Sequence, residues 1–153
     1  MNNNDLEKAK KYAFLLLKFR PRSQKEIYSR LKKKKFAEAV ISQTLSFLKE
    51  KGFLNDRLFS KSWIEFRIKN SYGFRKIEQE LKLKGIDKET IDAEIGDIKQ
   101  GYCEKDVIFG IAGERFRKLR GIETNKAKRR IFDYLMRRGF STGMVIDAVN
   151  RLR

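Results

Sequence analysis

The sequence predicts an all-α protein built from three tandem three-helix repeats. Three observations support this fold class. Pro21 is the only proline, and no segment alternates apolar and polar residues as a strand does. An apolar pattern also starts at Ile27, Ile77 and Ile131, with offsets of 0, 4, 9, 14, 18 and 21 residues, and all eighteen positions are apolar. Because only 41% of the residues are hydrophobic, chance does not account for this agreement, and a structural repeat follows.

A helix precedes the first copy of the pattern, over residues 5–19. Pro21 ends this helix, Ser23 caps the next one, and Glu26 three residues later completes a capping box. The apolar stripe of the first helix is formed by Leu6, Ala9, Ala13, Leu16 and Leu17.

Each copy of the pattern predicts two helices joined by a turn, because the offset of five residues breaks the helical phase. Gly85 and Gly139 occupy this turn in copies two and three, where glycine readily takes a left-handed conformation. Asp87 and Ser141 then follow as N-caps. Copy one has Lys35 at the glycine position, so we expect its turn to be strained or differently shaped.

Two further helices are predicted over residues 55–69 and 102–119, with Asn55 or Asp56 as the N-cap of the former. The aromatic side chains Phe59, Trp63 and Phe66 have helical spacing, which favours a core position over a base-stacking platform.

The chain is expected to be a single domain, residues 1–153, in which repeat one covers about 5–54, repeat two about 55–100 and repeat three about 101–153. A unit of about fifty residues buries only a modest core, so neighbouring units must pack on one another. The expected result is an elongated, curved array, right-handed or open, that exists as a monomer.

The charge indicates a polyanionic partner. Lysine and arginine total 37 against 20 acidic residues, a formal net charge of +17. Nucleic acid is the first partner to consider, and an acidic protein surface or an anionic membrane the second. A merely solvated, highly charged surface is the alternative.

Other features of the composition bear on location and chemistry. Cys103 is the only cysteine, which excludes an internal disulfide and indicates a reducing compartment, and we expect it to be packed among helices. No apolar run is long enough to span a bilayer, and the first residues lack a signal-peptide core, so a cytoplasmic protein is expected. The chain has no histidine and no phosphate-cradling glycine loop. We therefore expect no catalytic residue, no metal site, no cofactor and no enzymatic activity.

Four segments resemble motifs of the RecX family and occur in the family's order. They are residues 20–27 (RPRSQKEI), 52–59 (GFLNDRLF), 77–86 (IEQELKLKGI) and 135–140 (LMRRGF). Departures are Asn55 in place of the first aspartate, Ser60 in place of a common alanine and Lys35 in place of the first turn glycine. The resemblance implies a helical three-repeat fold and binding in the groove of RecA filaments on single- or double-stranded DNA. It also implies modulation, usually inhibition, of strand exchange and of coprotease activity, without a catalytic group.

Clustered cations are the candidate contacts to DNA or RecA, because lysine and arginine neutralise phosphates and release counterions. The candidates are Arg20, Arg22, Lys25, Lys32, Lys33, Lys34, Lys35, Arg57, Arg67, Arg75, Lys76, Lys126, Lys128, Arg129, Arg130, Arg137 and Arg138. A solvated face, or cations placed at helix C-termini, is the alternative interpretation. A stand-alone DNA-binding architectural protein and an RNA-binding or ribosome-associated factor are the alternative functions.

Overall fold

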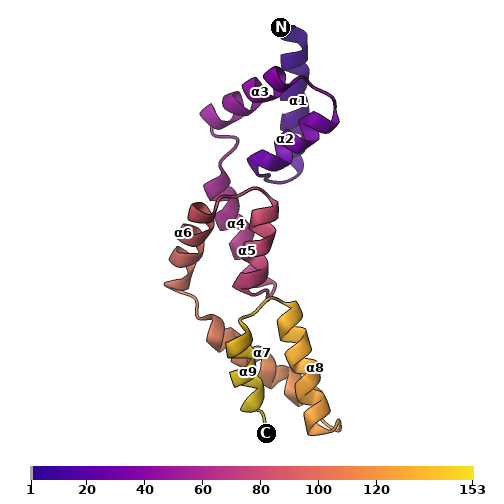
Figure 1. Cartoon of the computed structure of the whole chain (residues 1–153), viewed down its shortest axis with the longest axis vertical. Coiled ribbons are helices and arrows are strands. Elements are labelled where there is room, and N and C mark those ends of the chain that lie inside the picture. Colours follow the sequence, from indigo (N-terminus) through magenta and orange to yellow (C-terminus); the bar gives the residue numbers. More distant parts are fainter. Residues whose placement is uncertain (1) are drawn as a thin grey trace. The chain divides into compact units, whose positions relative to one another are not determined.

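The computed structural model describes residues 2–153, and within that range it contains nine helices and no strand (Figure 1). The all-α prediction is confirmed. The helices are α1 (Asn3–Phe19), α2 (Gln24–Lys33), α3 (Glu38–Glu50), α4 (Asp56–Lys69), α5 (Phe74–Leu83), α6 (Lys88–Lys99), α7 (Glu104–Lys118), α8 (Thr124–Arg137) and α9 (Thr142–Asn150). They follow the predicted order of three helices for each repeat.

Capping residues set the beginnings of several helices, largely as predicted. Ser23 and Glu26 form the capping box of α2. Asn55 caps α4, because its Oδ1 accepts the Leu58 N–H at 3.1 Å. Asp87 caps α6 in the same way.

Ser141 occupies the N-cap position of α9 as predicted, but without a side-chain cap. The backbone N–H of Ser141 donates to Glu104 Oε1 at 3.3 Å, so a carboxylate of another helix accepts a backbone hydrogen bond at the start of α9.

The turn between the second and third helices is the same in all three repeats. Lys35, Gly85 and Gly139 have φ of 67°, 79° and 83° respectively. In each repeat the next N–H donates to the carbonyl five residues earlier, at 3.3, 3.0 and 3.3 Å. Lys35 therefore adopts the left-handed conformation at a cost of about 1 kcal/mol that the two glycines avoid, which confirms the expected strain.

The repeat register is confirmed by burial. Fifteen of the eighteen predicted positions are buried, and the other three, Phe36, Ile98 and Leu152, are half-buried. The assignment of Phe66 to the core is wrong, because it is 56% exposed. Ile64 is fully buried, and Phe66 is two residues further along the helix and so lies nearly on its opposite side.

Two compact units can be distinguished. One consists of the chain up to Ser62 together with Leu81–Ile91, and the other of Trp63–Glu80 together with Asp92–Arg153. The first contains a core between α1, α2 and α3, centred on Ala9, Ala13, Ile27, Leu31 and Leu48. The second contains a core between α7, α8 and α9, centred on Ile108, Ala112, Ile131, Leu135 and Phe140. The elongated array and the monomeric state stay predictions.

Two findings concern expectations about single features. Cys103 is exposed just before α7, so the expectation that it packs among helices is wrong. Among residues 2–153, no helix combines the length and the apolar character needed to cross a bilayer.

Candidate nucleic-acid interface

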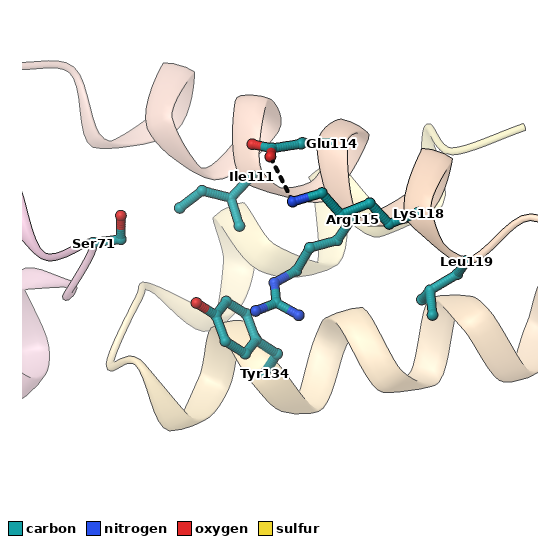
Figure 2. Close-up of a pocket in the computed structure, with 7 residues that line it drawn as sticks. All are labelled: Ser71, Ile111, Glu114, Arg115, Lys118, Leu119 and Tyr134. Carbon is teal, nitrogen blue, oxygen red and sulfur yellow. Dashed lines mark ion pairs between the residues drawn. The ribbon is translucent and has the colours of Figure 1, made fainter.

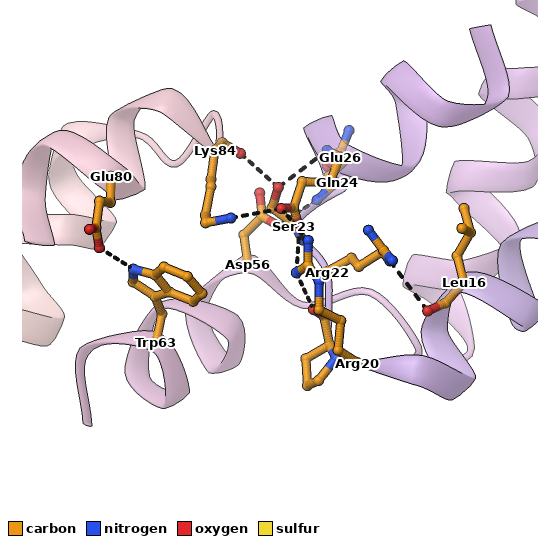
Figure 3. A network of polar contacts seen from close by, with 11 residues as sticks. Leu16, Arg20, Arg22, Ser23, Gln24, Glu26, Asp56, Trp63, Glu80 and Lys84 are labelled. Atoms are coloured by element: carbon orange, nitrogen blue, oxygen red, sulfur yellow. Dashed lines mark hydrogen bonds and ion pairs between the residues drawn. The ribbon is translucent and has the colours of Figure 1, made fainter. Parts of the chain in front are cut away.

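A polar junction, here called the first junction, joins the start of α2 to the starts and ends of later helices (Figure 3). The Gln24 N–H donates to Asp56 Oδ1 at 2.9 Å, which ties the start of α2 to the start of α4. The Ser23 hydroxyl donates to the Lys84 carbonyl at 2.7 Å, which ties it to the end of α5. These two bonds hold the start of α2 in place, and the basic residues of α2 follow directly after it.

A second junction repeats this arrangement at the start of α5. The Phe74 N–H donates to Glu104 Oε2 at 3.2 Å, at the start of α7. The Gly73 N–H donates to the Arg138 carbonyl at 2.8 Å, at the end of α8. Gly73 lies fifty positions after Ser23, and Arg138 lies fifty-four positions after Lys84. The spacings of the sequence repeat therefore reappear as a repeated contact.

The first junction is charge-balanced. Glu26 accepts hydrogen bonds from Arg20 at 3.0 Å, from Lys84 at 2.8 Å and from the Ser23 N–H at 3.0 Å. Partial burial alone would raise the pKa of Glu26, but these bonds outweigh it and lower the pKa to about 2. Arg22 donates to the Leu16 carbonyl at 3.3 Å. The candidates Arg20 and Arg22 thus already have partners within the fold.

The second junction is rich in cations that surround Tyr72. Arg67, Arg138 and Lys76 lie 3.6, 4.4 and 5.1 Å from the centre of its ring. Of these three, only Arg67 forms an ion pair with a carboxylate among the described residues, and its partner is Glu80. Arg138 donates to the Asn70 carbonyl and Lys76 to the Arg137 carbonyl, contacts that leave their charge uncompensated.

Arg138 also connects this group to a second tyrosine. It lies 5.2 Å from the ring centre of Tyr134, whereas Arg115 lies only 3.3 Å from it (Figure 2). Partial burial alone would raise the pKa of Tyr134, but hydrogen bonding and charge from Arg115, with charge from Arg138, lower it below its usual value. Arg115 and Tyr134 were not among the candidates expected from the sequence. They lie on separate helices, and no spacing in the sequence pairs them.

Two cavities of about 290 Å³ each adjoin this pair, and Arg115, Leu119 and Tyr134 line both. The first is also lined by Ser71, Ile111, Glu114 and Lys118 (Figure 2). The second is also lined by Arg130, Ile131, Asp133 and Arg137. Apolar side chains and cations therefore meet in a hollow between α7 and α8.

The lysine run over the end of α2 and the following turn, residues 32–35, is exposed, as a binding surface requires. Lys32 forms an ion pair with Glu38, and Lys34 lies 5.2 Å from the ring centre of Tyr12. Lys33 and Lys35 have no ion pair among the described residues. Because four cations at a helix C-terminus also stabilise the helix dipole, their position alone does not separate binding from stability.

The basic cluster of α8 differs in this respect. Lys126, Arg129 and Arg130 are exposed and Lys128 is half-buried, and none of the four forms an ion pair within residues 2–153. The cluster starts in the first turn of α8, which contains no acidic residue. Of the four, only Lys126 is close enough to the helix start to oppose the helix dipole, and the Glu123 carboxylate accepts its N–H at 2.9 Å there; the other three lie too far from either end of the helix to interact with the dipole. Helix stabilisation therefore does not account for this cluster.

The remaining candidates are distributed over the junctions. Lys25, Arg57 and Arg137 are exposed. Arg75 is exposed as well and donates to Thr142 at 3.2 Å. No group of three or more metal-ligand side chains occurs in the part of the chain that the structure describes.

Comparisons with known proteins follow the same division into repeats. Residues 9–48, 55–94 and 107–149 match the first, second and third three-helix domains of RecX. "Regulatory protein RecX" of Mycobacterium sp. (strain JLS) is 32% identical over 152 residues, covering 95% of this chain and 82% of that protein. The protein of the same name from Clostridium beijerinckii is 30% identical over 147 residues, covering 95% and 68%. The chain belongs to the RecX family.

Solved RecX structures share the fold. "Crystal structure of RecX from Lactobacillus salivarius" matches with a TM-score of 0.82 and 20% identity, over 99% of this chain and 98% of that one. "Crystal structure of regulatory protein RecX" matches with a TM-score of 0.76 and 20% identity, over 96% and 72%.

The RecX-like motifs of the sequence coincide with the two junctions. Residues 20–27 and 52–59 contain Ser23, Gln24 and Asp56 of the first junction, and residues 77–86 contain Lys84. The last motif, residues 135–140, contains Arg138 of the second. In this RecX-family chain, the motifs that carry the resemblance are therefore residues that connect one helix start to another.

Proposed function

We propose that this chain is a non-enzymatic regulator that binds RecA recombinase filaments on DNA and inhibits their recombinase and coprotease activities. Membership of the RecX family supports a regulatory role, since its relatives are named regulatory proteins. A monomer in the cytoplasm that binds single- and double-stranded DNA, without a cofactor, completes the proposal.

The observation that carries the proposal is the unpaired basic cluster at the start of α8. None of Lys126, Lys128, Arg129 and Arg130 forms an ion pair among residues 2–153, and none lies in the last turn of α8, where a cation would stabilise the helix dipole. Cations that do not serve the fold are suited to a polyanion outside it. The exposed lysine run at the end of α2 supports the same partner.

Co-sedimentation with RecA filaments, compared with naked DNA at equal salt concentration, tests the proposal. The chain is expected to pellet with filaments at salt concentrations that release it from naked DNA, because protein contacts are less screened than phosphate contacts. Strand exchange and RecA-stimulated repressor cleavage, measured in parallel, should both decrease.

A stand-alone DNA- or RNA-binding architectural protein is the alternative that the net charge of +17 also supports. It predicts equal retention on filaments and on naked nucleic acid at every salt concentration. It also predicts no effect on strand exchange at concentrations that leave most of the DNA unbound. Either result would contradict the RecA-directed proposal.

A further inference from the structure

Arg115 combines an aromatic contact with a place in the lining of both cavities between α7 and α8. Its guanidinium carbon lies 3.3 Å from the ring centre of Tyr134, which is stacking distance (Figure 2). It lines both cavities together with Leu119 and Tyr134. The Arg115 side chain therefore contacts the Tyr134 ring and at the same time borders both cavities.

The surroundings of Arg115 combine two kinds of chemistry. Leu119, Ile111 and Ile131 supply apolar surface to the cavities. Arg130 and Arg137 line the second cavity together with Asp133, so its cations outnumber its one carboxylate, and neither arginine forms an ion pair within residues 2–153. Lys118 adds a cation at the first cavity, although Glu114 pairs with it at 2.9 Å. A fitting ligand therefore has a flat apolar part beside an anionic part.

We propose that this hollow binds an unpaired nucleotide of a single strand, with the base stacked on Arg115 and the phosphates beside Arg130 and Arg137. Guanidinium planes serve as stacking surfaces for unpaired bases, and arginine suits phosphate oxygens through its fork of donors. Each cavity, at about 290 Å³, is near the lower end of small-ligand sites and suits one nucleotide.

Two other ligands fit less well. A base in a duplex presents only its edge, so it does not reach a stacking surface within a hollow. An acidic peptide would satisfy the cations but leave the flat side of Arg115 without a stacking partner. This inference rests on the proposed function, because it names the part of the nucleic acid that one site of the regulator recognises.

Arg115→Lys is the decisive variant, because it keeps the positive charge and removes the planar group. We expect the variant to bind a short oligothymidylate about 5-fold or more weakly than the unaltered protein, the loss typical of one stacked base. Binding of an abasic strand of equal length and of a duplex should be unchanged. Arg117→Lys, an exposed change of the same kind on the same helix, is the matched control and should change none of the three.

Equal oligothymidylate affinity for Arg115→Lys and the unaltered protein would overturn the inference. A loss of the same size on thymidine, abasic and duplex probes would also overturn it, because stacking would not be involved.

A second measurement does not depend on a variant. Photocross-linking of a 4-thiothymidine strand to the unaltered protein should label peptides of α7 or α8, and labelling confined to other helices would contradict the site. Co-sedimentation of Arg115→Lys with RecA filaments distinguishes this inference from the proposed function. If filament binding persists while the stacking prediction is contradicted, only the nucleotide site is wrong.

Discussion

The two junctions share an arrangement of helix-start hydrogen bonds but differ in their electrostatics. At each, a helix start donates one N–H to an acidic residue that begins another helix and one hydrogen bond to a carbonyl that ends a third. At the first junction Glu26 binds Lys84 in an ion pair. At the corresponding positions of the second junction, Lys76 and Arg138 are both cations and lie against the Tyr72 ring.

This difference shows which contacts fix the junction. Backbone donors and one carboxylate recur in both, so they set the geometry, whereas the flanking charges are free to differ.

The second junction also depends on close backbone approach. A Cβ on Gly73 would lie 2.3 Å from the Gly139 carbonyl oxygen, too close for any side chain. Ser23 occupies the same place in the first junction, where its hydroxyl makes the contact instead.

The largest effect is expected for Gly139→Ala, because two penalties combine there. The residue has φ of 83°, and an added Cβ would lie 2.2 Å from the Lys76 Cβ and 2.7 Å from its backbone nitrogen. Left-handed strain and overpacking together predict a loss of about 3 kcal/mol in the free energy of unfolding, measured by urea denaturation.

Gly52→Ala is the matched control for Gly139→Ala. Gly52 has φ of 78° but nothing within 4 Å of an added Cβ, so the strain alone should cost about 1 kcal/mol. Equal losses for the two variants would show that close backbone approach does not hold the second junction together.

A smaller difference is expected between the two junction carboxylates. Glu104 accepts two backbone N–H groups, from Phe74 and Ser141, whereas Asp56 accepts one, from Gln24. Glu104→Ala should therefore destabilise by about 2 kcal/mol and Asp56→Ala by about 1 kcal/mol, as measured by thermal or urea unfolding. A larger loss for Asp56→Ala would mean that the first junction contributes more to stability than the second.

The pH dependence of stability tests the first junction separately, because hydrogen bonds there lower the pKa of Glu26. The pKa of Glu26 is about 2 in the folded chain against about 4.5 in the unfolded one. A lowered folded pKa gives stability that is complete above pH 4.5 and lost as the pH falls toward 2. Because Glu26 is only partly buried and solvent screens its interactions, we expect the lowered pKa to contribute about 1 kcal/mol.

Glu26→Gln isolates this contribution from that of other carboxylates. The gap in unfolding free energy between the unaltered protein and the variant should be widest above pH 4.5 and should close between pH 4.5 and 2. A gap that stays constant over this range would contradict the ion-paired state of Glu26.

Much of the fold could be predicted because burial follows helical periodicity. The repeat positions from Ile27 to Leu152 were identified from spacing alone, as was the strained turn at Lys35. The core prediction for Phe66 is wrong because it rests on the aromatic side chains alone. The buried Ile64 shows which side of the helix faces the core, and Phe66 lies on the other side. The missing cap at Ser141 could not be foreseen, since its partner Glu104 comes from a different helix.

The candidate site was predictable only where charge is dense in the sequence. The cations of residues 32–35 and 126–130 are evident from the sequence, and all of them except the half-buried Lys128 are exposed in the structure. The pairing of Arg115 with Tyr134 is a tertiary contact between two helices, and each residue alone is inconspicuous in the sequence. Arg20 and Arg67 were equally visible as candidates, but the acidic partners that occupy them became apparent only in three dimensions.

Binding of the Lys126, Lys128, Arg129 and Arg130 to Gln quadruple variant, measured over a range of salt concentrations, tests the central claim most directly. Affinity for naked DNA should fall, and the slope of log affinity against log salt should decrease by about 0.7–0.9 for each phosphate that the variant no longer neutralises. Affinity for preformed RecA filaments should fall less, because direct protein contacts remain. Folding should be nearly unchanged, since each exposed charge contributes little. Wild-type affinities and slopes on both partners would show that the cluster is only a solvated face. Equal collapse on both would show DNA binding without RecA recognition and contradict the account.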